Sequence, residues 1–293
     1  MILITGFTGN TGSLVLSKLL GKYDASEIIG LTRKEHIENE HNINLVFGEL
    51  SDSETIEKVF LEHNIQGVIH IANIRYSPLI MELANKYKVE RVILVHTTGV
   101  YSKYRDYSKL YRQIEAKIMN NSYPHTSYVI VRPTMIYGNE RDHNMHKLIK
   151  FLNKYPAFPV FGDGSALMQP VHVEDLADGI VLAFENSDIS NEDFDLSGGS
   201  VVEYKKVLKL IKNELNKKVF FAHIPLGTAI LAAKIYNKAF RKAIITVEQV
   251  ERLQEDKAYP NAKAKGIIGF NPRSFEEGII QEVRLLKSKG LIK

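Results

Sequence analysis

Three glycines near the amino terminus constrain the fold more than any other feature of the sequence. Ile2 to Ile4 predicts a short strand, Gly6, Gly9 and Gly12 predict a turn, and Thr11 to Leu20 predicts a helix. Glycines at such a turn let the backbone approach a ligand closely, and the free N–H groups of a helix start favour a phosphate. The spacing differs from the usual dinucleotide fingerprint, so an ordinary glycine turn remains the alternative.

Apolar runs alternate with helical stretches along the first half of the chain. They predict strands at 27–31, 43–47, 67–71, 91–95 and 128–131, which indicates a doubly wound parallel α/β sheet. With 293 residues, 44% of them apolar, the chain can form one large domain or a main domain with a smaller lobe. The strict alternation of predicted strands and helices is lost after Tyr155, so a substrate lobe is expected to follow.

The composition argues against several classes of protein. A net charge of +4 without a basic run argues against nucleic-acid binding, and the absence of cysteine excludes disulfides and thiol catalysis. The first strand begins at residue 2, which leaves no room for a leader segment, so a cytoplasmic location is the default expectation. Helices are expected at 226–240 and 246–255, and the first is too short and too charged to cross a membrane.

The end of the second strand bears on cofactor choice. Thr32, Arg33 and Lys34 lie about twenty residues beyond the glycine turn, where a dinucleotide fold contacts the adenosine ribose. An acid there binds the 2′-hydroxyl of NAD, whereas an arginine accommodates the 2′-phosphate of NADP. Arg33 with Thr32 therefore favours NADP, while Glu35 keeps NAD as a second candidate and solvated loop charges as the plain alternative.

Hydroxyl groups gather after the fifth strand. Thr97 and Thr98 follow the strand directly, and Tyr107 and Tyr111 lie at the entry to the next helix. Together they could supply a hydroxyl donor and a phenolic acid or base at one site. Caps at a strand end would explain the threonines equally well, and packing at a dimer surface would explain the tyrosines.

A series of further motifs follows in order along roughly the first 200 residues. They are Thr5 to Gly12, Gly48 to Asp52, Val68 to Ala72, Thr97 to Tyr101, Arg132 to Gly138, Phe161 to Gly164, Val171 to Ala177 and Phe194 to Gly199. With these motifs the chain resembles the extended and atypical short-chain dehydrogenases, the NAD-dependent epimerase/dehydratase family.

The resemblance implies a Rossmann domain over residues 1–160, to which some later segments return, and a smaller C-terminal α/β substrate lobe over 161–293. It also implies a homodimer formed by the helices near 78–86 and 107–120, and it places Thr97 at the active-site serine or threonine. The expected cofactor-binding residues are Gly6, Phe7, Thr8, Gly9, Asn10, Thr11, Gly12, Thr32, Arg33, Glu49, Leu50, Ala72, Asn73, Pro133 and Thr134.

The proton-carrying pair of the family, Tyr-x-x-x-Lys, is missing. If Glu115 is aligned with the helix glutamate of the family, Tyr107 falls at the tyrosine and Tyr111 at the lysine. If Ser108-Lys109 is aligned with the serine and lysine of the family, the lysine is kept but Arg105 falls at the tyrosine. Neither register restores the pair.

Other polar residues have plainer interpretations. His70 lies inside a buried strand and is expected to be a core histidine, and 172–175 reads as a helix start. No histidine has partners with the spacing of metal ligands, so no metal is expected. Arg132 and Arg141 are candidates for binding an anionic group of the substrate. Met168 lies where many sugar-nucleotide enzymes of the family carry an arginine for the nucleotide phosphate, which argues against a sugar-nucleotide substrate specifically.

Two functions from different classes follow. The first is an NAD(P)-dependent oxidoreductase or epimerase that prefers NADP and acts on a small carbonyl or sugar-type substrate. Thr97 would orient the substrate oxygen, Tyr107 or Tyr111 would carry the proton, and Arg141 would bind the substrate. The second is a cofactor-binding regulator or assembly factor whose active site has decayed, which the missing pair motivates.

Overall fold

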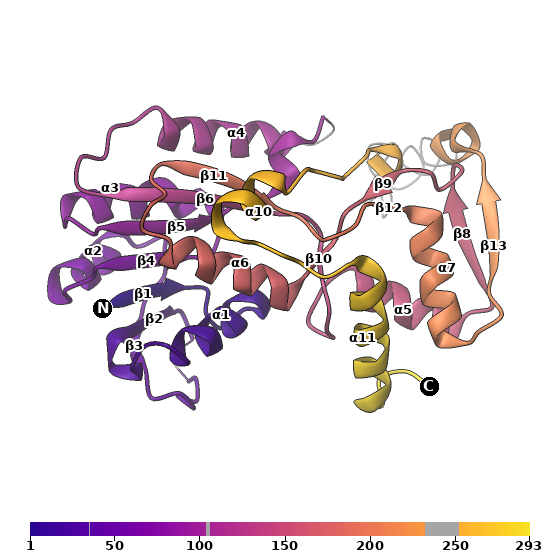
Figure 1. Ribbon diagram of the computed structural model, residues 1–293, viewed down its shortest axis with the longest axis horizontal. Coiled ribbons are helices and arrows are strands. Elements are labelled where there is room, and N and C mark those ends of the chain that lie inside the picture. The colour runs from indigo at the N-terminus through magenta and orange to yellow at the C-terminus, as the bar shows by residue number, and fades with distance from the viewer. Residues whose placement is uncertain (35, 104–105, 232–251) are drawn as a thin grey trace.

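The computed structural model describes residues 1–34, 36–103, 106–231 and 252–293, without the side chains of residues 106 and 107. Figure 1 shows an elongated molecule with a helix-flanked sheet at one end and a smaller lobe at the other. The amino terminus lies at the sheet end, and the chain finishes after the last helix, beside the smaller lobe (Figure 1). Of the helix expected at 226–240, residues 226–231 are described and helical, whereas 232–240, like 246–251 of the helix expected at 246–255, lie outside the described residues.

The main sheet contains seven strands within the described residues, all parallel, in the order β11-β6-β5-β4-β1-β2-β3. They are β1 (Ile2–Thr5), β2 (Ile28–Thr32), β3 (Asn44–Phe47), β4 (Gly67–His70), β5 (Arg91–Val95), β6 (Ser127–Pro133) and β11 (Glu192–Leu196). The doubly wound parallel sheet expected from the sequence is thereby confirmed. The strand order reverses between β1 and β4, which is where such folds bind ligands.

Helices cover both faces of this sheet (Figure 1). One face carries α1 (Asn10–Leu20), α6 (Val173–Glu185) and α10 (Ala262–Ile268), and the other carries α2 (Ser53–Glu62), α3 (Ser77–Lys86) and α4 (Asp106–Met119). Alternate residues of one strand serve the two cores, since Ile2 and Ile4 face the α1 side and Leu3 faces the other. Strands buried on both faces must be apolar throughout, which explains the continuous apolar runs in the sequence.

The smaller lobe has its own core. It is built from β7 (Ile136–Tyr137), α5 (Met145–Lys154), β8 (Ala157–Phe161), β9 (Leu167–Met168), β12 (Val202–Glu203), α7 (Tyr204–Leu215), β13 (Phe220–Ile224) and α11 (Phe275–Ser288). Strand β8 pairs with β13, β9 pairs with β12, and β7 pairs with β10 (Val171–His172). Ile149, Leu208 and Ile279 pack together at its centre.

The chain passes between the two parts several times. It leaves the sheet after β6, returns for α6 and β11, leaves again for α7, and returns once more for α10 before ending in α11. Short 3₁₀ turns join some of these elements: η1 (Ala25–Glu27), η2 (Ile74–Tyr76), η3 (Thr98–Tyr101) and η4 (Arg252–Gln254). None of the helices in the described part of the chain combines the length and the apolar character that a membrane span requires.

Candidate functional site

The glycine turn joins β1 to α1 at the point where the strand order reverses. Gly6 has a φ of +77°, a conformation that glycine adopts readily and other residues rarely do. The N–H of Gly9 donates to the carbonyl oxygen of Gly6 at 3.0 Å, and α1 begins at the next residue. A Cβ atom at Gly12 would lie 2.1 Å from that same oxygen. Only glycine therefore allows α1 to start this close to the strand, where its free N–H groups face a ligand.

A cavity of about 600 Å³ lies on one side of this turn. Of the expected cofactor residues, those lining it are Gly6, Thr8, Gly9, Thr32, Arg33, Glu49, Leu50, Ala72 and Asn73. The turn also packs against the end of β4, since a Cβ atom at Gly6 would lie 3.0 Å from the nitrogen of Ala72. Residues from the ends of β1, β2, β3 and β4 thus surround one space, as expected for the carboxyl edge of a parallel sheet.

A second cavity, of about 480 Å³, lies on the other side of the same turn. The expected site residues that line it are Asn10, Thr11, Thr97, Thr134 and Arg141. Its remaining lining comes from η3 and Ser102, from β7 and the loop before α5, from β9 and the two residues after it, and from residues between 252 and 259. The glycine turn is the boundary between the two cavities, because Thr8 and Gly9 line the first and Asn10 and Thr11 line the second.

Three expected cofactor residues line neither cavity. Phe7 is 6% exposed, and its ring packs where a Cβ atom of Gly30 would lie, so its side chain is part of the core rather than a cofactor contact. Gly12 is needed because only a residue without a side chain fits this close to Gly6. The carbonyl oxygen of Pro133 accepts a hydrogen bond from the Thr98 hydroxyl at 3.1 Å. The resemblance gives the positions of these residues along the chain but not the direction in which each side chain points.

Thr97 both caps η3 and lines the second cavity. Its Oγ1 accepts a hydrogen bond from the N–H of Gly99 at 3.0 Å, which caps η3. Because that bond uses Oγ1 as the acceptor, the hydroxyl hydrogen remains available to a group in the cavity that Thr97 lines. A cap and a substrate contact are therefore compatible at this residue.

Of the two α4 tyrosines expected at the site, only Tyr111 has a described side chain. The Tyr111 ring is half-buried against the core beneath α3 and α4 and lies near Gly99. No described side chain of α4 lines either cavity. The side chain of Tyr107 lies outside the described residues, as does Arg105 of the alternative register. Tyr111 thus packs rather than facing the cavity that contains Thr97.

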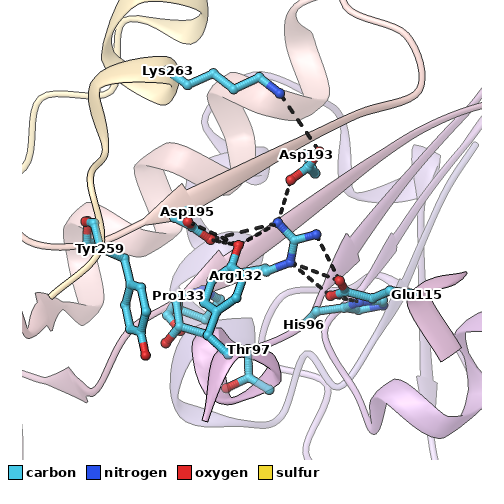
Figure 2. Close-up of polar contacts among 12 residues, drawn as sticks. His96, Thr97, Glu115, Arg132, Pro133, Asp193, Asp195, Tyr259 and Lys263 are labelled. Carbon is cyan, nitrogen blue, oxygen red and sulfur yellow. Dashed lines mark hydrogen bonds and ion pairs between the residues drawn. The ribbon is translucent and has the colours of Figure 1, made fainter. Parts of the chain in front are cut away.

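A buried ionic network lies behind Thr97 (Figure 2). Arg132 is 4% exposed, and its Nε and Nη2 donate to the carboxylate of Glu115 at 2.9 and 2.8 Å. Its Nη1 donates to Asp193 and, at 3.1 Å, to the Tyr101 hydroxyl. Burial alone would lower the pKa of Arg132, but the hydrogen bonds and charge of Glu115 raise it instead. The expectation that Arg132 binds a substrate anion is therefore wrong, because carboxylates within the fold already hold it.

The same network contains a serine, a histidine and an acid in a row, as in the catalytic triads of hydrolases. The ring nitrogens of His96 lie 3.0 Å from the Ser77 hydroxyl and 3.0 Å from the Glu115 carboxylate. Burial lowers the pKa of His96, although its hydrogen bond with Glu115 opposes that shift. Ser77 has no exposed surface, so no substrate can reach it. We interpret this row of three residues as a polar link between α3, β5 and α4.

Arg141 lies at the glycine turn. Its Nη2 donates to the carbonyl oxygen of Thr8 at 2.7 Å, and its Nη1 donates to the Ser13 hydroxyl at 3.1 Å. In the same loop, the Asn139 amide donates to the Asn10 side chain at 2.9 Å. The loop between β7 and α5 is thus tied to the start of α1. Arg141 lines the second cavity at the end formed by the glycine turn, rather than at the wall formed by residues between 252 and 259.

The structural interpretations of His70 and of the helix start at His172 are confirmed. His70 has no exposed surface and lies 2.7 Å from the Thr5 hydroxyl, and burial, with a smaller contribution from His96, lowers its pKa to about 3. His172 caps α6 by accepting from the N–H of Glu174. Within the described residues, no three histidine or acidic side chains are grouped so that they could hold a metal ion.

Sequence reasoning missed the far wall of the second cavity. Arg252, Glu255, Lys257 and Tyr259 line it together with Met168 of β9. The helix expected at 246–255 would end in this stretch, and the sequence assigned no role to residues 256–259. No local signal marks the face that lines the cavity, because Asp256 is as polar as Glu255 and Lys257 and the residues do not alternate.

Comparisons with known proteins agree with this geometry. A model of the NAD dependent epimerase/dehydratase family matches residues 2–197, a range that contains every strand of the main sheet. The dTDP-D-glucose 4,6-dehydratase of Dictyostelium discoideum is 25% identical over 269 residues, with 71% of this chain and 62% of that protein covered. The mitochondrial NADH dehydrogenase (ubiquinone) 1 alpha subcomplex subunit 9 of the same organism is 26% identical over 177 residues, with 56% and 48% covered.

The chain therefore spans between about half and two thirds of the length of these two curated relatives. Among solved structures, a UDP-glucose 4-epimerase from Thermotoga maritima with bound UDP-glucose superposes with a TM-score of 0.75 at 20% identity, over 98% of this chain and 99% of that one. This likeness establishes the fold. Since one family model accounts for the glycine turn, the strand-end threonines and the whole parallel sheet, the chain belongs to the NAD dependent epimerase/dehydratase family.

Proposed function

We propose that the protein is a dinucleotide-dependent oxidoreductase of the epimerase or dehydratase type that acts on a nucleotide-linked sugar. The observation that carries this proposal is the pair of cavities, of about 600 and 480 Å³, that meet at the glycine turn. Each has the size of a small-molecule site. The family and the names of the relatives favour a sugar nucleotide over the broader class of small carbonyl compounds.

The residues of the turn fit a dinucleotide. No side chain covers the backbone at Gly6 and Gly9, and the first N–H groups of α1 are free to bind a diphosphate. The first cavity would hold the adenosine, and the second would hold the nicotinamide with the reacting sugar. The nicotinamide ring supplies the hydride chemistry when the cofactor is bound. Thr97 would hold the reacting oxygen by its free hydroxyl hydrogen, and Arg141 would add a positive charge beside the diphosphate.

We further propose a preference for NADP over NAD. Arg33 and Lys34 are exposed and line the adenosine cavity, where a guanidinium can bind a 2′-phosphate through two hydrogen bonds. Glu49 lines the same cavity and is the acidic group that could favour NAD instead.

Calorimetry with both dinucleotides tests this preference. Arg33→Glu should weaken NADP binding by at least ~10-fold and leave NAD binding little changed, because one charge-assisted contact to phosphate is worth about 1.5–3 kcal/mol. Lys58→Glu makes the same charge change on the exposed surface of α2 and should alter neither affinity. Equal effects of the two substitutions would show that Arg33 does not contact the cofactor.

Turnover separates the two functions considered from the sequence. The purified protein is incubated with each dinucleotide and with UDP-glucose or dTDP-glucose, and the sugar products are followed by NMR. An enzyme of this type should convert at least one of the two sugars. Dinucleotide binding with neither sugar converted would favour the regulator or assembly factor. Failure to bind either dinucleotide at millimolar concentration would refute both.

A further inference from the structure

The segment from Glu255 to Tyr259 presents every second side chain to the cavity that contains Thr97. Glu255, Lys257 and Tyr259 line it, whereas Asp256 and Ala258 do not. The segment runs beside β9, because the N–H of Lys257 donates to Leu167 at 2.7 Å and the carbonyl of Lys257 accepts from Gln169 at 3.2 Å. An extended chain turns alternate side chains to one side, so this pairing fixes which three face the cavity.

Tyr259 is the most firmly positioned of the three. Its N–H donates to the Gln169 side chain at 3.1 Å, and its carbonyl accepts from the Ser197 hydroxyl at 2.6 Å. Its ring packs on Tyr101 with the centroids 5.0 Å apart, and Tyr101 is held in turn by hydrogen bonds to Asp195 and Arg132. Both the backbone and the ring of Tyr259 are therefore fixed before any ligand binds.

The hydroxyl of Tyr259 is left for a ligand. In Figure 2 the ring stands beside the Arg132 network with its oxygen directed to the side on which Thr97 and Pro133 lie. That oxygen forms no hydrogen bond with any described residue, while the ring and backbone of the same residue are fully engaged. A rigid phenol with an unused donor in a cavity is the arrangement that proton transfer requires.

We propose that Tyr259 is the proton carrier of the reaction, taking the place of the tyrosine that the family carries on α4. This inference rests on the proposed function. In the reducing direction, the substrate carbonyl carbon gains hydride from the reduced nicotinamide and its oxygen takes the phenolic proton, which leaves a phenolate and an alcohol. In the oxidising direction, the phenolate takes the proton of the carbinol as hydride leaves the carbon.

The surrounding charges suit this role. Burial raises the pKa of Tyr259, and Glu255 and Asp195 shift it in the same direction, so the phenol holds its proton at neutral pH, as the reducing direction requires before catalysis. Lys257 lines the same cavity, and its ammonium donates to the carbonyl oxygen of Arg252 at 3.1 Å. Its positive charge would stabilise the phenolate once the proton has left. Lys257 thus offers the positive charge that the missing helix lysine would have supplied.

Three Tyr→Phe variants test the assignment with UDP-glucose and dTDP-glucose as probes. Tyr259→Phe removes one oxygen and keeps the ring stacking, so kcat should fall by ~100-fold or more, while calorimetry should show the dinucleotide affinity of the wild type. Tyr107→Phe should retain activity. Tyr155→Phe, on an exposed ring of the smaller lobe, is the matched control. Tyr259→Phe with wild-type kcat, or a loss confined to Tyr107→Phe, would overturn the proposal.

A second readout does not depend on turnover. Tyrosine labelled at the ring carbon that bears oxygen gives NMR signals, and the one lost in Tyr259→Phe belongs to Tyr259. We expect that signal to move when NAD or NADP is added and again when UDP-glucose is added, while the Tyr155 signal stays in place. A dinucleotide that binds without moving the Tyr259 signal contradicts the inference alone. No dinucleotide binding, or no turnover by the wild type, contradicts the proposed function and this role with it.

Discussion

The buried acid Glu282 gives a prediction whose size follows from the structure. It lies in the middle of α11 with no exposed surface, and its Oε2 accepts a hydrogen bond from the N–H of Gly138 at 3.1 Å. Burial, and then its contact with the Asp142 side chain, raise its pKa from 4.5 to about 10. The native protein therefore keeps a proton on Glu282 at neutral pH, whereas the unfolded chain releases it.

The sign of the effect on stability follows from this difference in bound protons. The contribution of Glu282 to the free energy of unfolding is greatest below pH 4.5, where both states bind the proton. It falls as the pH rises toward about 10, because only the unfolded chain releases the proton in this range. The loss is about 1.4 kcal/mol of unfolding free energy per pH unit, which amounts to about 3 kcal/mol at neutral pH. Glu282→Gln keeps an acceptor for Gly138 and a donor for Asp142 but has no proton to release. The variant should therefore be more stable than the wild type by about that amount.

Urea unfolding at several pH values between about 6 and 9 measures the effect. The stability difference between Glu282→Gln and the wild type should grow by about 1.4 kcal/mol per pH unit over this range. Glu62→Gln, at an exposed position at the end of α2, is the control and should give a small difference that does not vary with pH. A constant difference for Glu282→Gln would refute the reasoning, since it would mean that the native protein carries an ionised Glu282.

Other substitutions test the turn and the buried network. Gly12→Ala places a Cβ atom 2.1 Å from a backbone oxygen of the turn, so calorimetry should show no dinucleotide binding and the melting temperature should fall. The control is Gly266→Ala in α10, whose Cβ atom meets nothing within 4 Å, and it should change neither the binding nor the melting temperature. Arg132→Met leaves Glu115 buried without its counter-charge and should cost about 3–5 kcal/mol in urea unfolding. Lys263→Met, which breaks half-exposed pairs with Glu192 and, at 3.8 Å, with Asp193 at the edge of the network, should cost less than about 1 kcal/mol, and similar costs for the two would argue against the network.

The sheet and the cofactor turn could be predicted from the sequence because their signals are local. A strand buried on both faces must be apolar at every position, as in Ile28 to Leu31, and a helix that starts against a strand end needs glycine at Gly12. The same reasoning located the hydroxyl at Thr97 directly after a strand. Each of these inferences needed only neighbouring residues.

The rest of the site depends on contacts between distant segments. The pairing of Lys257 with β9 turns Tyr259 toward the cavity, and no local pattern fixes that pairing. Arg132 was open to interpretation as a substrate ligand because its partners, Glu115 and Asp193, lie on other elements and charge alone does not identify them. Phe7 lies within the glycine motif, yet its direction is set by the packing of β2.

The repeated passage of the chain between its two parts also limits how it can be divided. A fragment ending at residue 160 would keep β1 to β6 but would lack β11, which forms an edge of the sheet, and α6, which covers α1. Val15, Leu16 and Leu19 would then lose the helix against which they pack and expose a contiguous apolar surface to water. We therefore expect such a fragment to aggregate when expressed alone.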